Sequence, residues 1–319
     1  MNNAGQNAAP CSRYPQRDSR RARAVGRMAV WLLGLTVSGS VLAFDADVHP
    51  AFTRAAVEVY QACPGVTVSA EAAEAAEALI AGTQAEDASL ATVGQRISNW
   101  HFYNRNASLK PMWFASRNLD HIFATRVRQL NERVAQGPAA STAQVYQQAG
   151  RVLHYIQDMS VPAHVVPVFH VKLLVWNLED GFDQFPLSPS MASFRLSQAQ
   201  CEALRADAEG SNPSGRLTRT ASATLAAIGQ RGGSVNAGAW REYWVYPSPE
   251  AAQAEKGWGE YGRCTFVKGT QAPGCKSDAE LEALFAQQSV QTLKDSVWML
   301  FYVDRQLKAR AGETVVINP

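Results

Sequence analysis

The sequence contains neither the G-x-S-x-G elbow of serine hydrolases nor a Walker loop for nucleotide phosphates. No motif therefore supports a serine nucleophile or P-loop chemistry. Cysteines are few, five in all, and no two of them have the C-x-x-C spacing of a cysteine zinc site. There is also no internal repeat and no alternation of apolar and polar residues longer than a few positions, so no extended sheet is predicted.

Charge is scarce as well. Only 18% of the 319 residues are charged and 46% are hydrophobic, so the chain can bury a large core. Residues 1–43 hold six arginines and one aspartate, and without them the formal charge changes from +2 to 24 − 27 = −3. The basic character thus belongs to the N-terminal segment. No arginine-rich face remains that would favour duplex nucleic acid as a partner.

Residues 1–43 have the organisation of an export signal. Arginines up to Arg27 precede an apolar run that ends in small residues. The run is interrupted by serine, threonine and glycine and is short for a membrane span, which disfavours an anchor. We expect cleavage between Ala43 and Phe44, export to the periplasm or beyond, and one mature domain over residues 44–319.

The four cysteines of the mature chain predict two disulfides, as is common in exported proteins. A bond between Cys264 and Cys275 would close a glycine-containing loop, which leaves Cys63 to pair with Cys201. This is one of three pairings that the count allows.

Apolar periodicity predicts an all-α, multi-helix domain with long irregular loops. Residues 82–115 and 231–276 are expected to be irregular, since glycine, asparagine and aromatic residues interrupt the pattern there. The predicted helices cover residues 50–62, 69–80, 116–136, 141–159, 171–185, two segments between 198 and 229, and 278–309.

The segment 152–170 holds three of the six histidines. His154 and Asp158 are four residues apart, so on a helix they share one face and can meet at one or two cations. Pro162 is expected to end the helix, with His164 entering from the turn beyond it. The negative end of the helix dipole adds to the attraction for a divalent ion. This spacing predicts the core of a zinc site.

Other candidate ligands come from earlier in the chain. His49 follows the expected new N-terminus by five residues, and the free amine and carbonyl of Phe44 could chelate the same ion. Alternatively, His49 only caps the helix that starts at Pro50. Asp87 and His101 lie in the segment expected to be irregular, where they could also be ordinary turn residues.

In order and rough spacing, these pieces resemble the zinc-dependent phospholipase C and P1 nuclease superfamily, over residues 44–185. The pieces are His49 near a processed N-terminus, the Glu86-Asp87 pair, the Asn99 to Tyr103 run around His101, and His154 to Asp158 followed by Pro162-x-His164. The resemblance implies an all-helical fold that holds three zinc ions.

The resemblance also implies a role for each ligand. It assigns Asp87, His101, His154 and Asp158 to one zinc, and the backbone of Phe44, His49 and a bridging Asp158 to a second. His164 and two later residues hold the third, for which relatives use a His-x-x-x-Glu pair. This sequence has no histidine after His170, so Glu179 and Asp183 at helical spacing are the expected substitutes. His170 or Asp180 could serve instead, and Glu179 could equally be a solvated residue.

The function implied is metal-assisted phosphodiester hydrolysis, in which Asp87 could orient or deprotonate the attacking water. The Glu86-Asp87 stretch and the lack of a glycine-rich lead before His49 favour the phospholipase C arm, acting on a glycerophospholipid. The aromatic loop 240–246 could rest on a membrane surface or pack in the core. The alternatives are a single-strand-preferring nuclease or 3′-nucleotidase and a non-catalytic helical metal-binding module. We expect a monomer that meets the membrane transiently.

Overall fold

The computed structural model describes most of the chain after residue 47, all of it in one compact unit. The predicted signal segment, Phe44, the loop 89–100 and Glu179 lie outside the described residues. The residues described are 48–88, 101–103, 119–173, 176–178, 180–187, 191, 193–229, 240–246, 248, 250, 257–270 and 272–312.

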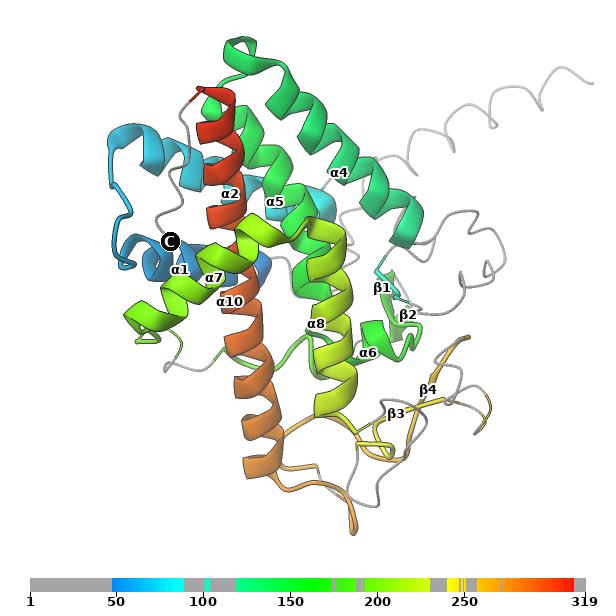
Figure 1. The fold of residues 1–319 in the computed structure, drawn as a ribbon. Coiled ribbons are helices and arrows are strands. Elements are labelled where there is room, and N and C mark those ends of the chain that lie inside the picture. The colour runs from blue at the N-terminus through cyan, green and yellow to red at the C-terminus, as the bar shows by residue number, and fades with distance from the viewer. Residues whose placement is uncertain are drawn as a thin grey trace, which may run out of the picture. The chain divides into compact units, whose positions relative to one another are not determined.

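The fold is all-α, as the periodicity predicted (Figure 1). The strands of the described residues form only two-stranded antiparallel pairs, β1 (Val171–Leu173) with β2 (Trp176–Leu178) and β3 (Trp244–Val245) with β4 (Glu260–Tyr261). The helices are α1 (Val48–Gln61), α2 (Ala70–Ala88), α4 (Leu119–Ala135), a short 3-10 turn (Gly137–Ala139), α5 (Thr142–Asp158), α6 (Pro162–Val165), α7 (Gln198–Gly210), α8 (Pro213–Ala227) and α10 (Asp278–Arg310).

The starts of several helices can be recognised in the sequence from their capping residues. Ser141, Ser197 and Ser277 each cap a helix, and each forms a capping box with the glutamine or glutamate three residues later. In α8, Asn212 accepts the bond from the Gly215 N–H, and a proline takes the first helical position. These caps satisfy amide groups that the first turn of a helix leaves without a partner.

Helix α5 lies at the centre of the core. Its apolar side chains Val152, Leu153 and Ile156 are fully buried, and it packs against α2, α4, α8 and α10. Helix α10, drawn in orange to red in Figure 1, runs past α1, α5, α7 and α8. Burial on this scale contributes roughly 1.5–3 kcal/mol for each large apolar side chain. His154 and Asp158 therefore lie on a helix that is enclosed by four others.

Helix α2 is longer than predicted. The expected end near Ile80 was wrong, because Gly82 continues the helix and does not break it. A Cβ on Gly82 would lie 2.2 Å from the Gln147 carbonyl oxygen, and one on Gly150 would lie 2.2 Å from that of Leu79. These glycines let α2 and α5 approach closely, at some cost in helix propensity. Asp87 therefore lies on a helix that is held against α5.

The predicted helix over residues 171–185 was also wrong. Val171 pairs with Leu178 and Leu173 with Trp176 in an antiparallel hairpin, and a turn at 181–184 follows. A short apolar run rich in valine, leucine and tryptophan fits either structure by periodicity alone, and β-formers favour the strand. His164 differs in a smaller way, because it lies on the one-turn helix α6 that Pro162 begins.

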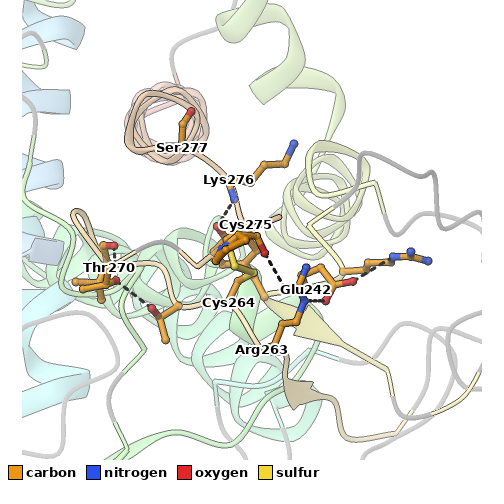
Figure 2. The surroundings of a disulfide bond; sticks show 12 residues. Glu242, Arg263, Cys264, Thr270, Cys275, Lys276 and Ser277 are labelled. Atoms are coloured by element: carbon orange, nitrogen blue, oxygen red, sulfur yellow. Dashed lines mark hydrogen bonds and ion pairs between the residues drawn. A yellow bond between two sulfur atoms is a disulfide. The ribbon is translucent and has the colours of Figure 1, made fainter.

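Both expected disulfides are present. Cys63 is bonded to Cys201, which joins the end of α1 to α7, and Cys264 is bonded to Cys275. Figure 2 shows the second bond beside the start of α10, where Arg263 Nε donates to Glu242 Oε2 over 2.9 Å. The Cys264 amide also donates to the Glu242 carbonyl oxygen over 2.8 Å.

The aromatic side chains of residues 240–246 lie in the core. Tyr243 and Trp244 are 2% and 1% exposed, and both rings pack against Phe266. The membrane-surface interpretation of this loop was therefore wrong, and the core interpretation is confirmed. Two disulfides are compatible with an exported protein. Among the described helices, none has the length and apolar character needed to cross a membrane.

Candidate metal centre

Six predicted ligand residues from five segments converge in the interior. Each is at most 5% exposed, and subsets of them bring donor atoms within 4.8 Å of one another, so these buried groups could hold metal ions. Helix α1 contributes His49, α2 contributes Asp87, the segment 101–103 contributes His101, α5 contributes two ligands and α6 contributes one. The set is His49, Asp87, His101, His154, Asp158 and His164.

Asp158 is the hub of this arrangement. Its Oδ2 lies 2.6 Å from Nδ1 of His101 and 3.5 Å from Nε2 of His154. Its Oδ1 lies 3.2 Å from Nε2 of His49 and 3.7 Å from Nδ1 of His164. Ligand atoms of one tetrahedral zinc stand roughly 3.3 Å apart, because each is about 2.0–2.1 Å from the ion. Both carboxylate oxygens of Asp158 therefore lie near the spacing that ligand atoms of a shared cation would have.

Asp87 lies at one side of the same cluster of candidate ligands. Its Oδ1 lies 3.7 Å from Nε2 of His154 and its Oδ2 lies 3.8 Å from Nε2 of His49. The neighbouring Glu86 has a different role, since it accepts from Arg126 Nη2 over 3.0 Å and from the Tyr155 hydroxyl over 2.6 Å. Of the Glu86-Asp87 pair, only Asp87 joins the metal cluster.

Three histidines are oriented by oxygen acceptors behind them. Nδ1 of His49 lies 2.7 Å from Gln157 Oε1, Nδ1 of His154 lies 3.0 Å from the Thr83 carbonyl oxygen, and Nδ1 of His170 lies 2.8 Å from that of Val168. A carbonyl oxygen can only accept, so Nδ1 carries the proton in each ring. Nε2 of each ring then faces the candidate ligands, which is the arrangement typical of metal-ligating histidines.

Gln157 is itself held in place from its other end. Its Nε2 donates to the hydroxyl oxygens of Thr53 and Ser296, each over 3.0 Å. These bonds leave only Oε1 to face His49. Gln157 was not predicted as a functional residue, although its position next to Asp158, on a helix that carries two candidate ligands, is visible in the sequence.

A second cluster lies beside the first. Nε2 of His170 is 3.1 Å from Nε2 of His164 and 3.1 Å from Oδ2 of Asp183. The expected pairing of His164 with Asp183 is therefore present, but the helical spacing that suggested it is not, because Asp183 follows the hairpin in a turn. His170 supplies the nitrogen. Asp180 instead accepts bonds from the Phe182 amide over 2.7 Å and from Trp244 Nε1 over 3.0 Å.

The charges of the two clusters follow from their surroundings. Burial by itself would raise the pKa of Asp158, but His154, His101 and His164 hold that pKa well below its usual range. Burial would likewise lower the pKa of His170, yet the hydrogen bond and charge of Asp183 raise it to about 9. Without a metal ion, His170 is therefore protonated at neutral pH.

No protein-family model matches the sequence, and no curated protein is significantly similar to it. The interpretation of the site accordingly depends on the donor atoms. Imidazole nitrogens combined with carboxylate oxygens suit zinc and related transition metals. Buried clusters of this composition can bind cations, polarise a bound substrate and position a water molecule.

Proposed function

We propose that the mature chain is an exported, zinc-dependent phospholipase C of the phospholipase C and P1 nuclease superfamily. The observation that carries this proposal is the common orientation of His49, His154 and His170. Each directs Nε2 toward a carboxylate while Nδ1 is tied to an oxygen acceptor. A purely structural histidine has no need for a second nitrogen that faces other histidines and carboxylates.

The donor set fits zinc on a second ground. Nε2 of His101, Nδ1 of His164 and Oδ1 of Asp158 are buried and make no hydrogen bond within the described residues. A buried polar atom left in this state costs about 1–3 kcal/mol, which coordination of a cation would offset. In the proposed assignment, Asp87, His101, His154 and Asp158 hold one zinc. His49, Asp158 and the Phe44 backbone hold the second, and His164, His170 and Asp183 hold the third.

Closely spaced zinc ions stabilise charge on phosphodiester oxygens and lower the pKa of water toward about 7. In this proposal, Asp158 and Asp87 have two further roles. Asp158 fixes the distance between neighbouring ligands because both of its oxygens face histidines. Asp87 lies at the edge of the group, where its carboxylate can orient or deprotonate the attacking water.

An aromatic wall beside the second cluster keeps the nuclease alternative open. The Phe102 ring lies 5.4 Å from that of His170 and 5.1 Å from that of Trp258, and it also contacts Phe169. Phe169 and Trp258 are only partly buried. Such rings can contact an acyl chain or stack on a nucleobase. The substrate therefore has to be decided by assay.

The test uses purified mature protein on phosphatidylcholine vesicles, with and without a metal chelator. We expect release of phosphocholine that the chelator abolishes and added zinc restores. No chelator-sensitive release would eliminate the phospholipase C proposal. Single-stranded DNA and RNA are assayed in parallel, because rapid degradation of these with no phospholipid cleavage would select the nuclease alternative.

A non-catalytic module is tested with Asp158→Asn. The substitution removes charge from the hub, so activity should fall to background while circular dichroism reports whether the helices persist. If Asp158→Asn retains full turnover on every substrate, the bridging role of Asp158 is wrong. If the wild-type protein binds zinc but hydrolyses none of these substrates, the non-catalytic module is the better account.

A further inference from the structure

A second cavity, separate from the metal centre, lies between the C-terminal part of α1, helix α7 and the C-terminal part of α10. Its volume is 350 Å³, within the range of small-molecule sites. None of the candidate metal ligands lines it, and Tyr60 in its wall is 11 residues along α1 from His49, or roughly 16 Å of helix. The lining residues are Tyr60, Gly65, Val66, Thr67, Arg205, Glu209, Phe301, Asp304, Arg305 and Lys308.

Three cationic side chains line this cavity: Arg205, Arg305 and Lys308. None of them forms an ion pair with another described residue. Arg205 Nη2 donates to the Pro64 carbonyl oxygen over 2.5 Å, and its guanidinium lies 4.8 Å from the centre of the Phe301 ring. Arg305 donates to the Glu209 carbonyl oxygen, and its guanidinium lies 5.3 Å from the centre of the Tyr302 ring. Both guanidiniums are thus held in place by neutral groups, with other N–H donors left over.

Elsewhere in the described chain, buried guanidiniums face carboxylates. Arg126 pairs with Glu86 over 2.9 Å, and Arg216 pairs with Asp207 over 2.8 Å. Arg205 and Arg305 are half-buried and have no carboxylate partner among the described residues, although the mature chain carries a formal charge of 24 − 27 = −3. Positive charge fixed without a partner is what an anion-binding site requires.

The acidic residues of the wall oppose this charge only in part. Both oxygens of Asp304 accept hydrogen bonds, one from the Tyr60 hydroxyl and the other from the Tyr146 hydroxyl. Glu209 is exposed, and its side chain is the one remaining carboxylate of the wall. The lining therefore carries three positive and two negative charges, with one of the negative charges held by two hydroxyl groups.

A second chamber of 170 Å³ adjoins the first and shares Tyr60, Val66, Thr67 and Asp304 with it. Its own lining is mainly apolar, with Val57, Ala72, Ala75, Ala76, Leu300 and Leu307, but it also includes the carboxylate Glu71, which accepts a hydrogen bond from the Thr142 hydroxyl over 2.8 Å. The two chambers together offer a charged compartment next to an apolar one. We propose that this double cavity binds an amphiphilic anion, an anionic head group at Arg205, Arg305 and Lys308 with a short apolar chain beside Ala72 and Leu307.

The test is calorimetric titration of the metal-loaded protein with octyl sulfate and with octanoate, below their micelle concentrations. Arg205→Gln and Arg305→Gln should each weaken binding by roughly tenfold, which is the effect of losing about 1.4 kcal/mol. Ala72→Leu fills the apolar chamber and should weaken both ligands while leaving inorganic sulfate unaffected. Arg128→Gln is the matched control, since Arg128 is an exposed arginine that pairs only with Glu132 at the surface.

Thermal unfolding of each variant confirms that it is folded before titration. No binding to the wild-type protein would overturn the proposal. Equal affinity for wild type, Arg205→Gln and Arg305→Gln would overturn it as well. Binding that disappears when a chelator is added, while thermal unfolding shows that the protein is still folded, would assign the ligand to the metal centre and would also contradict the proposal. The preference between octyl sulfate and octanoate identifies the head group.

Discussion

At the scale of the residue, the orientation of each ligand depends on a group behind it. Gln157 is the clearest case, because its amide accepts from His49 at one end and donates to Thr53 and Ser296 at the other. Second-sphere partners of this kind typically change metal affinity by about 10–100-fold when they are removed. Gln157 is therefore a positioning residue in the proposed site.

We predict that Gln157→Leu lowers zinc affinity by about 10–100-fold. The cause is the loss of the acceptor that keeps the proton on Nδ1 of His49. Competition with a chromophoric chelator measures the affinity. Gln157→Glu keeps an acceptor oxygen at the same position and should restore most of the affinity. Equal affinities for Gln157→Leu and wild type would contradict the role given to Gln157.

The second cluster should show a characteristic pH dependence. The pKa of His170 is raised to about 9 in the metal-free protein, above the ordinary value of 6.5. In that state the protonation of His170 contributes stability that is fully present below pH 6.5 and is lost as pH rises through about 9, while burial raises the pKa of Asp183 to about 7, so the two groups form an ion pair between about pH 7 and pH 9. Metal binding has the opposite sign, since the ion must displace the proton.

We therefore expect zinc binding at pH 8 to release close to one proton from His170, and the affinity of the site formed by His164, His170 and Asp183 to rise with pH up to about 9. Calorimetry in two buffers of different ionisation enthalpy measures the proton count. His170→Ala should lower the proton count by close to one. A proton count of zero in the wild-type protein at pH 8 would show that His170 is not a ligand.

The sequence predicted some ligands better than others, for a physical reason. His154 and Asp158 were visible because four-residue spacing on a helix fixes their relative direction. His170 and Asp183 were not assigned together, because a hairpin and a turn join them and no periodic spacing records that path. Asp87 was identified as a candidate, but its position on a helix was missed because Gly82 was taken as a break.

At the scale of the element, the crossing of α2 and α5 determines where Asp87 meets His154. Gly82 and Gly150 allow that crossing, since a Cβ on either would overlap a backbone carbonyl oxygen of the other helix. Glycine in a helix interior normally costs about 0.5–1 kcal/mol relative to alanine, so close packing is the compensating gain here.

Gly150→Ala is predicted to destabilise the protein by about 1–3 kcal/mol, the usual cost of overpacking. It should also weaken zinc binding, because separating the helices moves Asp87 away from His154. Gly210→Ala is the control, since a Cβ on that glycine meets nothing within 4 Å. Chemical denaturation and zinc titration of both variants test this. A Gly150→Ala variant as stable as Gly210→Ala would mean that the crossing tolerates a wider separation.

The elements themselves were largely predictable where a helix start has a cap. The three helices that follow the capping residues Ser141, Ser197 and Ser277 were predicted to start within one residue of where they do. Prediction failed at residues 171–185, where a run of apolar residues was too short to distinguish a strand from a helix. Tertiary contacts decide such segments, and a single sequence does not display them.

At the scale of the whole molecule, the disulfides constrain the chain to different extents. The bond between Cys63 and Cys201 spans 138 positions, whereas that between Cys264 and Cys275 spans 11. In the chain-entropy model a longer closed loop stabilises the folded state more, by about 4.7 kcal/mol for roughly 100 residues against about 3 for 15. The two bonds should therefore differ in their effect on stability.

We expect Cys63→Ala with Cys201→Ala to lower the free energy of unfolding by more than Cys264→Ala with Cys275→Ala does. The difference should be roughly 2 kcal/mol. Denaturation of the two double variants with zinc present measures it. A larger loss for the pair at 264 and 275 would show that local structure at the start of α10 matters more than chain entropy.

The central claim is that buried histidines and aspartates from distant segments bind metal ions together. The most direct measurement is the metal content of the purified mature protein by mass spectrometry, compared with Asp158→Asn prepared in the same way. The account predicts close to three zinc ions per chain in the wild type and a clear loss in the variant. A wild-type protein that binds no metal under zinc-replete conditions, yet remains folded, would contradict it.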